Sequence, residues 1–409
     1  MIRRLTVSWL CVLLIAQISF GEVLKKGDPY SVGMSAEQLA RIDEVIKAAI
    51  EAEETPGAIV LVARQGKVVY RKAFGDRARV RKQEPMTLDT IFDMASLTKV
   101  MATASAVMIL VEEGKIALTE PVVEYLPDFA AEDDREKRSI TLLNLLTHYS
   151  GLRPDVDLDD PWTGYETAIE LAYKEELVAP PGERFIYSDI NYFVLAEIVC
   201  QVTGKDIHEF TQERIFQPLG MKDTGFLPPP HLIPRIAPTE FPRWLYPGWE
   251  KDRMLRGAVH DPTTFRMGGL AGHAGLFSTA DDTAIFAQMI LNLGIYNGTR
   301  ILSPLSVLTM TTPQSPVDET DLRGIGFDIR SRFSTVRGSL FPLGSFGHTG
   351  FTGTSLWIDP FTKTFLILFT SRLHPKGEGD VVPLRKKVAS VVAAAILDIP
   401  ESLRERFYH

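Results

Sequence analysis

Two pairs of β-rich segments lie at opposite ends of this chain of 409 residues, and they constrain its fold more than any other feature. Residues 58–63 and 68–74 are rich in β-branched and aromatic side chains and are separated by a short turn. Residues 354–358 and 364–370 repeat the pattern. Because strands joined by short connections pair antiparallel, each pair predicts a β-hairpin. We expect both hairpins to enter one sheet, built from both ends of the chain.

Apolar residues at helical spacing mark the other segments of the chain. Ser35 predicts the start of a helix that runs to residue 53, and residues 382–397 predict a helix after the second hairpin. The helical segments between the hairpins are residues 100–111, 142–146, 167–177, 192–202 and 280–293. The chain is therefore predicted to be an α/β protein of the α+β type. An antiparallel sheet flanked by helices would carry an inserted, mostly helical domain.

The amino terminus has the pattern of a secretory signal peptide. Arg3 and Arg4 precede an apolar run over residues 5–20, and small residues follow at a suitable cleavage position. A membrane anchor is the alternative, but the run is shorter than the roughly 20 apolar residues that a span needs, and Gln17 interrupts it. We expect residues 1–21 to be a signal peptide that is removed. The protein would then be exported, periplasmic or secreted, with no membrane span in the mature chain.

The remainder, residues 22–409, is expected to form one domain made of two parts. The α/β part would cover about residues 22–95 and 320–409, and the helical part about residues 96–319. One stretch, residues 226–262, carries many prolines and shows no periodicity. Loops of this length are usually functional or mobile. The stretch is either a surface excursion held by its own aromatic residues or a wall or lid of a binding cleft.

The overall charge and the motifs that are missing exclude several classes of function. The formal net charge is −8 and no segment clusters Lys and Arg, which disfavours nucleic-acid binding. After removal of the signal only Cys200 remains, so the chain has neither a disulfide framework nor a cysteine metal site. The sequence contains no Gly-x-Ser-x-Gly, His-Glu-x-x-His or Gly-x-x-x-x-Gly-Lys-Ser/Thr motif. We expect no metal and no cofactor.

Ser96 and Lys99 form the only Ser-x-x-Lys motif in the chain. They are expected to open a helix after the strand-like residues 90–92, and positions i and i+3 of a helix lie on one face, so the two side chains can touch. The amino-terminal end of a helix favours developing negative charge by about 0.3–1 kcal/mol. A lysine whose pKa is lowered by burial could take the proton of the serine hydroxyl. The pair predicts a nucleophilic serine with a lysine base.

Two further segments carry groups that would complete such a site. Tyr187 stands at the beginning of residues 187–189, just before a helix, and its phenol could carry protons beside the lysine. Residues 347–350, Gly-His-Thr-Gly, precede a predicted strand and are expected along the sheet edge that faces the nucleophile. Small residues there admit a substrate backbone. The N–H groups of Phe351 and Ser96 would form an oxyanion hole.

These motifs together resemble the class C β-lactamase and penicillin-binding family. The family has Ser-x-x-Lys, Tyr-x-Asn and Lys-Thr-Gly, and the segments similar to them, in the same order, are Ser96-x-x-Lys99, Tyr187-Ser188-Asp189 and His348-Thr349-Gly350. Residues 92–95, 145–152 and 275–282 are similar to the family as well, and the resemblance covers about residues 35–396. It implies a β-lactamase/transpeptidase-like fold.

The resemblance also implies an acyl-enzyme mechanism. Ser96 would be the nucleophile, Lys99 and Tyr187 would share the general-base and general-acid work, and water would release the acyl group. His260 and His273 stand in Val-His-Asp and Gly-His-Ala-Gly pairings similar to those of members related to cell-wall carboxypeptidases, and a structural role in the loop is their alternative. The implied substrate-binding residues are Asp189, His348, Thr349, Gly350, His260 and His273.

Two positions depart from the family pattern. Asp189 stands where the family has Asn, and an ionised carboxylate cannot donate a hydrogen bond. His348 stands where the family has Lys, so the charge there becomes dependent on pH. Both departures weaken the case for a substrate that is an anionic β-lactam or that carries a peptide carboxylate.

We therefore expect an exported hydrolase of esters or amides, either an esterase or a D-alanyl-D-alanine carboxypeptidase-like enzyme. Its substrate would be a small molecule or a peptide acyl compound, including fragments of peptidoglycan. The alternatives are a penicillin-binding or cell-wall sensor module without efficient turnover, and a weak β-lactamase. Nucleic acid is not an expected partner, and the sequence does not indicate an oligomeric state.

Overall fold

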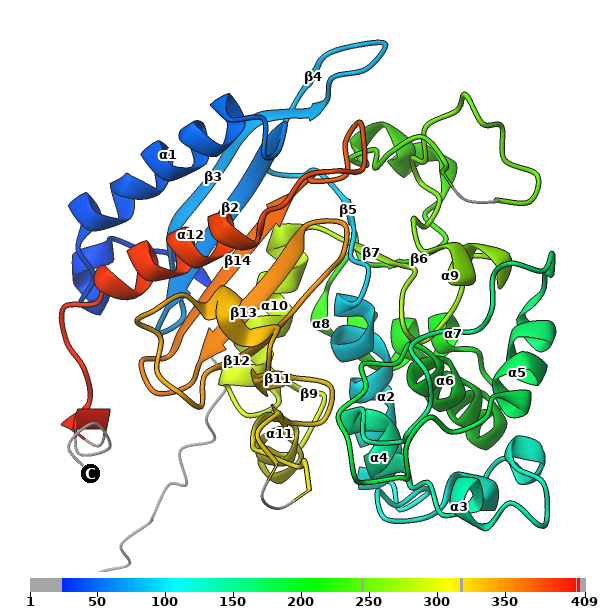
Figure 1. Cartoon of the computed structure of the whole chain (residues 1–409). Helices are drawn as coiled ribbons and strands as arrows, with labels where there is room; N and C mark the ends of the chain where they lie inside the picture. The colour runs from blue at the N-terminus through cyan, green and yellow to red at the C-terminus, as the bar shows by residue number, and fades with distance from the viewer. Residues whose placement is uncertain (1–23, 244–245, 317–318, 402, 405–409) are drawn as a thin grey trace, which may run out of the picture.

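The computed structural model of the chain describes residues 24–404 except 244–245, 317–318 and 402 (Figure 1). The predicted signal peptide, residues 1–21, lies outside the described residues. Within the part that is described, no helix combines the length and the apolar character that crossing a bilayer requires.

The main sheet contains strands from both ends of the chain, so the fold predicted from the two hairpins is confirmed (Figure 1). Its strand order is β1-β3-β2-β14-β13-β12-β11-β10, with β4 beside β3. Neighbouring strands are antiparallel, except that β1 and β3 are parallel. The bounds are β1 Lys25–Lys26, β2 Gly57–Arg64, β3 Lys67–Ala78, β4 Glu84–Pro85, β10 Leu322–Arg323, β11 Asp328–Arg330, β12 Phe346–Thr349, β13 Thr354–Asp359 and β14 Thr364–Thr370.

The two central strands, β2 and β14, are buried on both faces. Their side chains alternate between two cores because successive residues of a strand point to opposite faces. The register Leu61↔Ile367 joins the amino-terminal hairpin to the carboxyl-terminal one. One core contains Ile59, Leu61, Ala63, Phe365, Ile367 and Phe369. The other contains Ala58, Val60, Val62, Leu366 and Leu368.

Helices cover both faces of the sheet. On one face, α1 (Ala36–Glu51) and α12 (Val382–Ala394) lie side by side over the second core (Figure 1). On the other face, α10 (Ala280–Leu291) packs against β2 and β14 and connects the sheet to the helical part. The predicted cap of the first helix is present, because the Ser35 hydroxyl accepts a hydrogen bond from the Gln38 N–H at 3.1 Å.

The helical part lies to one side of the sheet and contains α6 (Ile190–Thr203), most of whose residues are buried (Figure 1). Its other α-helices are α2 Ser105–Glu112, α3 Arg135–Arg138, α4 Leu142–Thr147, α5 Tyr165–Lys174, α7 Ile207–Thr211, α8 Gln217–Leu219, α9 Pro262–Arg266 and α11 Pro304–Thr311. The 3-10 helices of the chain are Pro29–Val32, Val122–Glu124, Pro127–Phe129, Pro230–Arg235 and Ser334–Arg337, and Gln212–Phe216 is a π-helix. The small strands are β5 Phe92–Asp93, β6 Gly225–Phe226, β7 Leu276–Ser278, β8 Ile295–Tyr296 and β9 Thr299–Arg300.

The helix after Ser96 differs from the sequence prediction at its start. Ser96 lies in the turn before the helix, and Lys99–Ala104 form a π-helical segment before α2 begins. The Ser105 hydroxyl donates to the Val100 carbonyl, five residues earlier, at 2.9 Å. Short π segments inside helices are frequent at functional sites, and their wider turn is not visible in apolar periodicity.

Candidate active site

The nucleophile candidate Ser96 follows a turn that is held in an unusual backbone conformation. Strand β5 pairs with β7 and leads into this turn, in which Ala95 has φ 45°. A non-glycine residue in the left-handed region carries a conformational cost, which the surrounding structure must offset. Here Asp93 does so, since its Oδ1 accepts a hydrogen bond from the Ala95 N–H at 2.9 Å. The turn presents Ser96 at the wall of a cavity.

Lys99 lies directly beneath Ser96 and is completely buried. Its Nζ donates to Ser96 Oγ at 3.1 Å and to the His273 carbonyl at 3.1 Å. The same Nζ lies 2.6 Å from Asp189 Oδ1 and 5.0 Å from the centre of the Tyr187 ring. The predicted contact between Ser96 and Lys99 is therefore present, and Asp189 and Tyr187 complete the surroundings of the ammonium group.

The electrostatics of Lys99 differ from the sequence expectation. Burial alone lowers the pKa of a lysine, but the Asp189 carboxylate and the Tyr187 hydroxyl more than offset that effect here, and the net result is a raised pKa. Lys99 is thus an ammonium group in the resting site. The expectation that burial leaves it neutral is wrong, because the residue at position 189 supplies a charge that an amide would not.

Tyr187 is held by aromatic contacts on several sides. Its ring stacks on the His148 ring with centroids 4.4 Å apart, meets the edge of Phe333 at 5.5 Å and lies 6.1 Å from His348. His148 in turn accepts a hydrogen bond from the Ser188 N–H at 3.1 Å through Nδ1. His148 therefore supports Tyr187 from behind, in agreement with a packing role.

His348 occupies the middle of β12 and lines the same cavity as Ser96 and Tyr187. Its Nδ1 bonds to the Thr349 carbonyl at 2.9 Å, and since a carbonyl only accepts, this nitrogen carries the proton. Burial lowers the pKa of His348 well below its usual value, and the nearby charges of Arg323 and Lys99 act in the same direction. The imidazole is neutral near pH 7, so the expected pH-dependent cation at this position is not available there.

Two residues that line the cavity have main-chain N–H groups without a hydrogen-bond partner among the described residues. Within the described ranges, neither the Ser96 N–H nor the Phe351 N–H donates to another residue, and both residues line the cavity. The loop that carries Phe351 packs tightly on the nucleophile turn at Gly350. A Cβ at position 350 would lie 2.6 Å from the Met94 carbonyl oxygen and 2.1 Å from Thr354 Oγ1. This close approach requires glycine and supports the oxyanion hole predicted from the sequence.

The cavity has a volume of about 220 Å³ and contains residues that the sequence analysis missed. Ser96, Tyr187, His348, Thr349, Gly350 and Phe351 line it as expected. The additional lining residues are Arg323, Asp328, Phe333, Trp357, Arg372 and Arg385. Three guanidinium groups thus approach the nucleophile from strands and helices that are distant in the sequence.

These arginines are poorly compensated by carboxylates. Arg323 is 3.7 Å from Asp328, whereas Arg385 donates only to the carbonyls of Gly350 and Thr354, at 3.0 and 2.8 Å. Burial lowers the pKa of Arg385 to about 9, and the charge of Arg372 contributes. The Nε atoms of all three arginines are buried without a partner among the residues that the structure describes. Such a wall favours a bound anion, because burying an unpaired charge is costly.

One sequence signal could have identified Arg385. It lies on α12 three, four and seven residues before Val388, Ala389 and Val392, which are all buried in the core. An arginine on the apolar face of a helix needs a specific partner. Arg323 and Arg372 carry no comparable signal, because each lies in or just after a strand where an exposed arginine is common.

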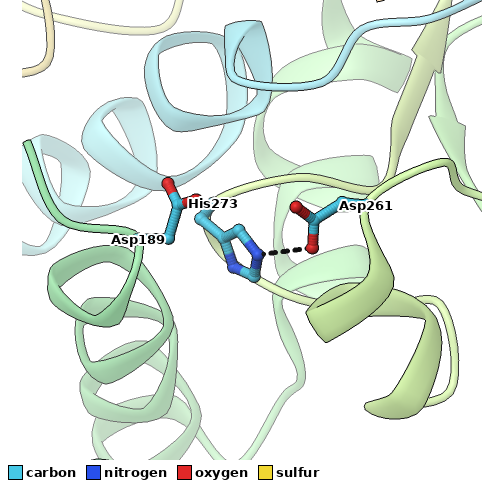
Figure 2. A group of neighbouring side chains, drawn as sticks. All are labelled: Asp189, Asp261 and His273. Atoms are coloured by element: carbon cyan, nitrogen blue, oxygen red, sulfur yellow. Dashed lines mark hydrogen bonds and ion pairs between the residues drawn. The ribbon is translucent and has the colours of Figure 1, made fainter. Parts of the chain in front are cut away.

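His260 and His273 lie behind the cavity and are not among its lining residues. The Nε2 of His273 bonds to Asp261 Oδ1 at 2.9 Å, and Figure 2 shows the ring between Asp261 and Asp189. Burial opposes the charge of His273, but Asp261 outweighs it and raises the pKa of the imidazole. His260 bonds to Glu240 through Nε2 at 2.6 Å. Direct substrate contact by either histidine stays a prediction.

Asp189, Asp261 and His273 also offer three potential metal ligands, whose donor atoms lie within 4.8 Å of one another. Each of them already has a charged partner, since Asp189 forms an ion pair with Lys99, and Asp261 forms one with His273. A cation would have to enter beside the Lys99 ammonium and displace these ion pairs. The arrangement therefore fits a network that supports Lys99 better than it fits a metal centre.

A sequence model of the Beta-lactamase family matches residues 42–390. This range includes all the residues of the candidate site. The chain belongs to the Beta-lactamase family. Membership makes it a serine hydrolase, the class that includes esterases, carboxypeptidases and β-lactamases.

Relatives within the Beta-lactamase family carry cell-wall names. A protein of Escherichia coli (strain K12) named "Putative D-alanyl-D-alanine carboxypeptidase" is 30% identical over 379 residues, which cover 86% of this chain and 86% of that protein. The N-acetylmuramyl-L-alanine amidase of Bacillus subtilis (strain 168) is 31% identical over 367 residues, which cover 83% of this chain and 82% of that one.

Solved structures of the Beta-lactamase family share the fold. EstCE1, a hydrolase with promiscuous acyltransferase activity, aligns with a TM-score of 0.69 at 23% identity over 87% of this chain and 99% of that one. The penicillin-binding protein homologue from Pyrococcus abyssi aligns with a TM-score of 0.66 at 24% identity over 90% of this chain and 80% of that one. At these identities the likeness establishes the β-lactamase/transpeptidase fold.

Proposed function

We propose that this chain is an exported D-alanyl-D-alanine carboxypeptidase-like enzyme that forms an acyl-enzyme on Ser96. The observation that carries the proposal is the arginine wall of the cavity beside Ser96. Arg372 and Arg385 provide cationic groups for a free terminal carboxylate, which the leaving D-amino acid of such a peptide has. They supply the positive charge for the substrate carboxylate, which the neutral His348 does not supply.

The geometry supports the following acylation step. Tyr187 enters the step as a phenolate, which the neighbouring Lys99 ammonium stabilises. Ser96 Oγ forms a bond to the substrate carbonyl carbon, and its proton passes to this phenolate oxygen, because Lys99 as an ammonium group has no free lone pair. Lys99 stabilises the charge on both oxygens from below. The carbonyl oxygen becomes an oxyanion that accepts hydrogen bonds from the Ser96 and Phe351 N–H groups. As the C–N bond breaks, Tyr187 returns the proton to the leaving amine.

Deacylation repeats these transfers with water. The water loses a proton to Tyr187 and attacks the ester carbonyl, and the bond to Ser96 Oγ breaks. Ser96 then recovers its proton from Tyr187. No other reactant is needed.

Export is supported by the charged, apolar and small-residue order of residues 1–21. The cell-wall names of the Escherichia coli and Bacillus subtilis relatives agree with a substrate outside the cytoplasm. Export is tested by amino-terminal sequencing of the protein recovered from periplasm and medium. A mature protein that begins near residue 22 is expected, and an intact amino terminus confined to the cytoplasm would reject this part of the proposal.

The activity is tested with purified protein and a peptide that ends in D-Ala-D-Ala. Release of free D-alanine and a transient mass increase on Ser96 are expected, and the Ser96→Ala variant should show neither while keeping its fold. A stable adduct without product release would instead favour the sensor alternative. Absence of both adduct and product for peptides, esters and β-lactams would reject a serine hydrolase at Ser96.

A second candidate reaction is cleavage of the amide between N-acetylmuramic acid and L-alanine. Its support is the identity of 31% with the Bacillus subtilis amidase over 83% of this chain. The same acyl-enzyme chemistry would serve either bond. Mass analysis of products from a muramyl peptide distinguishes them, because the carboxypeptidase releases D-alanine and the amidase releases the whole peptide.

A further inference from the structure

We propose that Asp93 and His260 are positioning residues that hold the two oxyanion-hole donors at a fixed separation. Through them, the segment of residues 226–262 supports catalysis without lining the cavity. The inference rests on the proposed function of Ser96 and Phe351. Three segments meet in what we call the clamp: the nucleophile turn at residues 93–96, the loop at residues 350–354, and His260.

Asp93 is the centre of the clamp. It is only 3% exposed, and both of its carboxylate oxygens are used. Oδ1 accepts from the Ala95 N–H at 2.9 Å, and Oδ2 accepts from the His260 N–H at 2.7 Å. The first bond occupies the N–H just before Ser96 and fixes the left-handed turn, so that it leaves the Ser96 N–H free to donate to a substrate oxygen. The second bond ties this turn to a distant segment.

The loop that carries the second donor is fastened to the same turn. The Thr352 hydroxyl donates to the Asp93 carbonyl at 2.6 Å, and the Thr354 hydroxyl donates to the Met94 carbonyl at 3.2 Å. The Phe351 N–H lies one residue before the first of these two attachment points along the chain. Its distance from the Ser96 N–H therefore depends on the clamp.

His260 closes the clamp through its ring. The imidazole stacks on the Phe351 ring with centroids 5.7 Å apart and an interplanar angle of 23°. Its Nε2 bonds to Glu240 at 2.6 Å, and the Tyr246 hydroxyl donates to its carbonyl at 2.5 Å. The stack fixes Phe351 from the side, and the two bonds anchor His260 within its own segment.

For residues 226–262 the clamp adds a supporting role that neither sequence interpretation included. Among the residues that the structure describes, none from this segment lines the cavity beside Ser96, so the segment is not a wall of it. Main-chain hydrogen bonds between Thr239 and Leu255 and between Leu255 and Glu240, both 2.9 Å, close the segment onto itself beside His260, which agrees with an excursion held by its own contacts. It acts as a support for the oxyanion hole.

The expected effect is on kcat and not on KM. Displacing a catalytic group by about 1 Å costs about a hundredfold in rate, and losing one oxyanion donor costs about a hundred- to a thousandfold. Asp93→Asn replaces one of the two acceptor oxygens by an NH₂ group, which cannot accept a hydrogen bond. The variant therefore loses either the bond from the Ala95 N–H or the bond from the His260 N–H. We expect kcat for an activated p-nitrophenyl ester to fall about ten- to a hundredfold with little change in KM.

The experiment compares two clamp variants with a matched control. His260→Gln keeps the main-chain bond to Asp93 but removes the ring stack, so its kcat should fall less than that of Asp93→Asn. Asp359→Asn is the control, because Asp359 is equally buried and also accepts main-chain N–H groups, from Phe361 and Thr362 at 3.2 Å, but belongs to a turn outside the clamp. Its kcat should stay within about twofold of the unmodified protein.

A transition-state analogue separates positioning from loss of stability. For the clamp variants, affinity for an alkylboronic acid, whose adduct on Ser96 places an oxygen in the oxyanion hole, should fall by the same factor as kcat. Unchanged kcat in both clamp variants, or a loss that the control matches at equal melting temperature, would overturn the inference. An unmodified protein without any Ser96 adduct would overturn the proposed function, and the inference would fall with it.

Discussion

Lys99 is completely buried and still keeps its proton, because the Asp189 carboxylate lies 2.6 Å away. The carboxylate at this position, where an amide would carry no charge, helps to raise the pKa of Lys99. In the proposed mechanism Tyr187 therefore accepts the proton, and Lys99 stabilises charge. The pH dependence of the reaction should report this division directly.

The Asp189→Asn variant tests that assignment. The carboxylate raises the pKa of Lys99 against the effect of burial, so its removal leaves burial to lower that pKa. Lys99 would then lose its proton at a lower pH, and the alkaline limb of the kcat/KM profile should move to lower pH. The measurement is a pH–rate profile for an ester whose own charge does not change. An unmoved alkaline limb would contradict the assignment.

Arg372 offers a second test at the scale of one residue. Its guanidinium lines the cavity and lies 4.4 Å from the centre of the Phe351 ring. A hydrogen bond to a charged group contributes about 1.5–3 kcal/mol, so Arg372→Gln should raise KM about ten- to a hundredfold for a peptide ending in a free carboxylate.

The C-terminal amide of the same peptide is the control for Arg372. It lacks the charge, so its KM should change little in the variant. Equal changes for both peptides would show that Arg372 supports the site without binding a carboxylate.

At the scale of elements, the hairpins and most helices were predictable, because apolar alternation and helical periodicity leave a direct trace in the sequence. The contact between Ser96 and Lys99 was predictable from their spacing of three residues, although Ser96 lies in the turn before the helix and Lys99 begins a π-helical segment. The charge of Lys99 was not, because it depends on a carboxylate that folding brings from another helix. The three arginines escaped notice since each stands alone in its own segment.

The cap of α1 gives a prediction for one element. The Ser35 hydroxyl accepts from the Gln38 N–H, and loss of such a cap costs about 0.5–2 kcal/mol. Ser35→Ala should lower the free energy of unfolding by about that amount, measured by urea denaturation, without change in KM. The control is Ser339→Ala, at an exposed position outside any helix, which should stay within about 0.5 kcal/mol.

At the scale of the whole molecule, β14 joins the carboxyl-terminal hairpin to the amino-terminal one. Ile367 is fully buried in the core on the α10 side, in register with Leu61 of the first hairpin. Replacing a buried isoleucine by alanine removes apolar contacts and leaves a cavity, at a cost of about 2–5 kcal/mol.

Ile367→Ala should therefore reduce the free energy of unfolding by about 2–5 kcal/mol in urea denaturation. Leu305→Ala is the matched control, because Leu305 is 75% exposed on α11 and its removal should change stability by at most about 0.5 kcal/mol. If both substitutions cost the same, the burial of β14 would not be what stabilises the molecule.

The position of β14 in the sequence also affects when the site can be completed during synthesis. Its neighbour β2 leaves the ribosome early, but β14 and the loop with Phe351 come from the last part of the chain. A nascent chain therefore contains Ser96 and Lys99 before Phe351, which carries the second oxyanion-hole donor, has been synthesised. Pairing of such distant segments is slow compared with local contacts. We therefore expect the site beside Ser96 to be complete only after residues 346–370 have paired within the sheet.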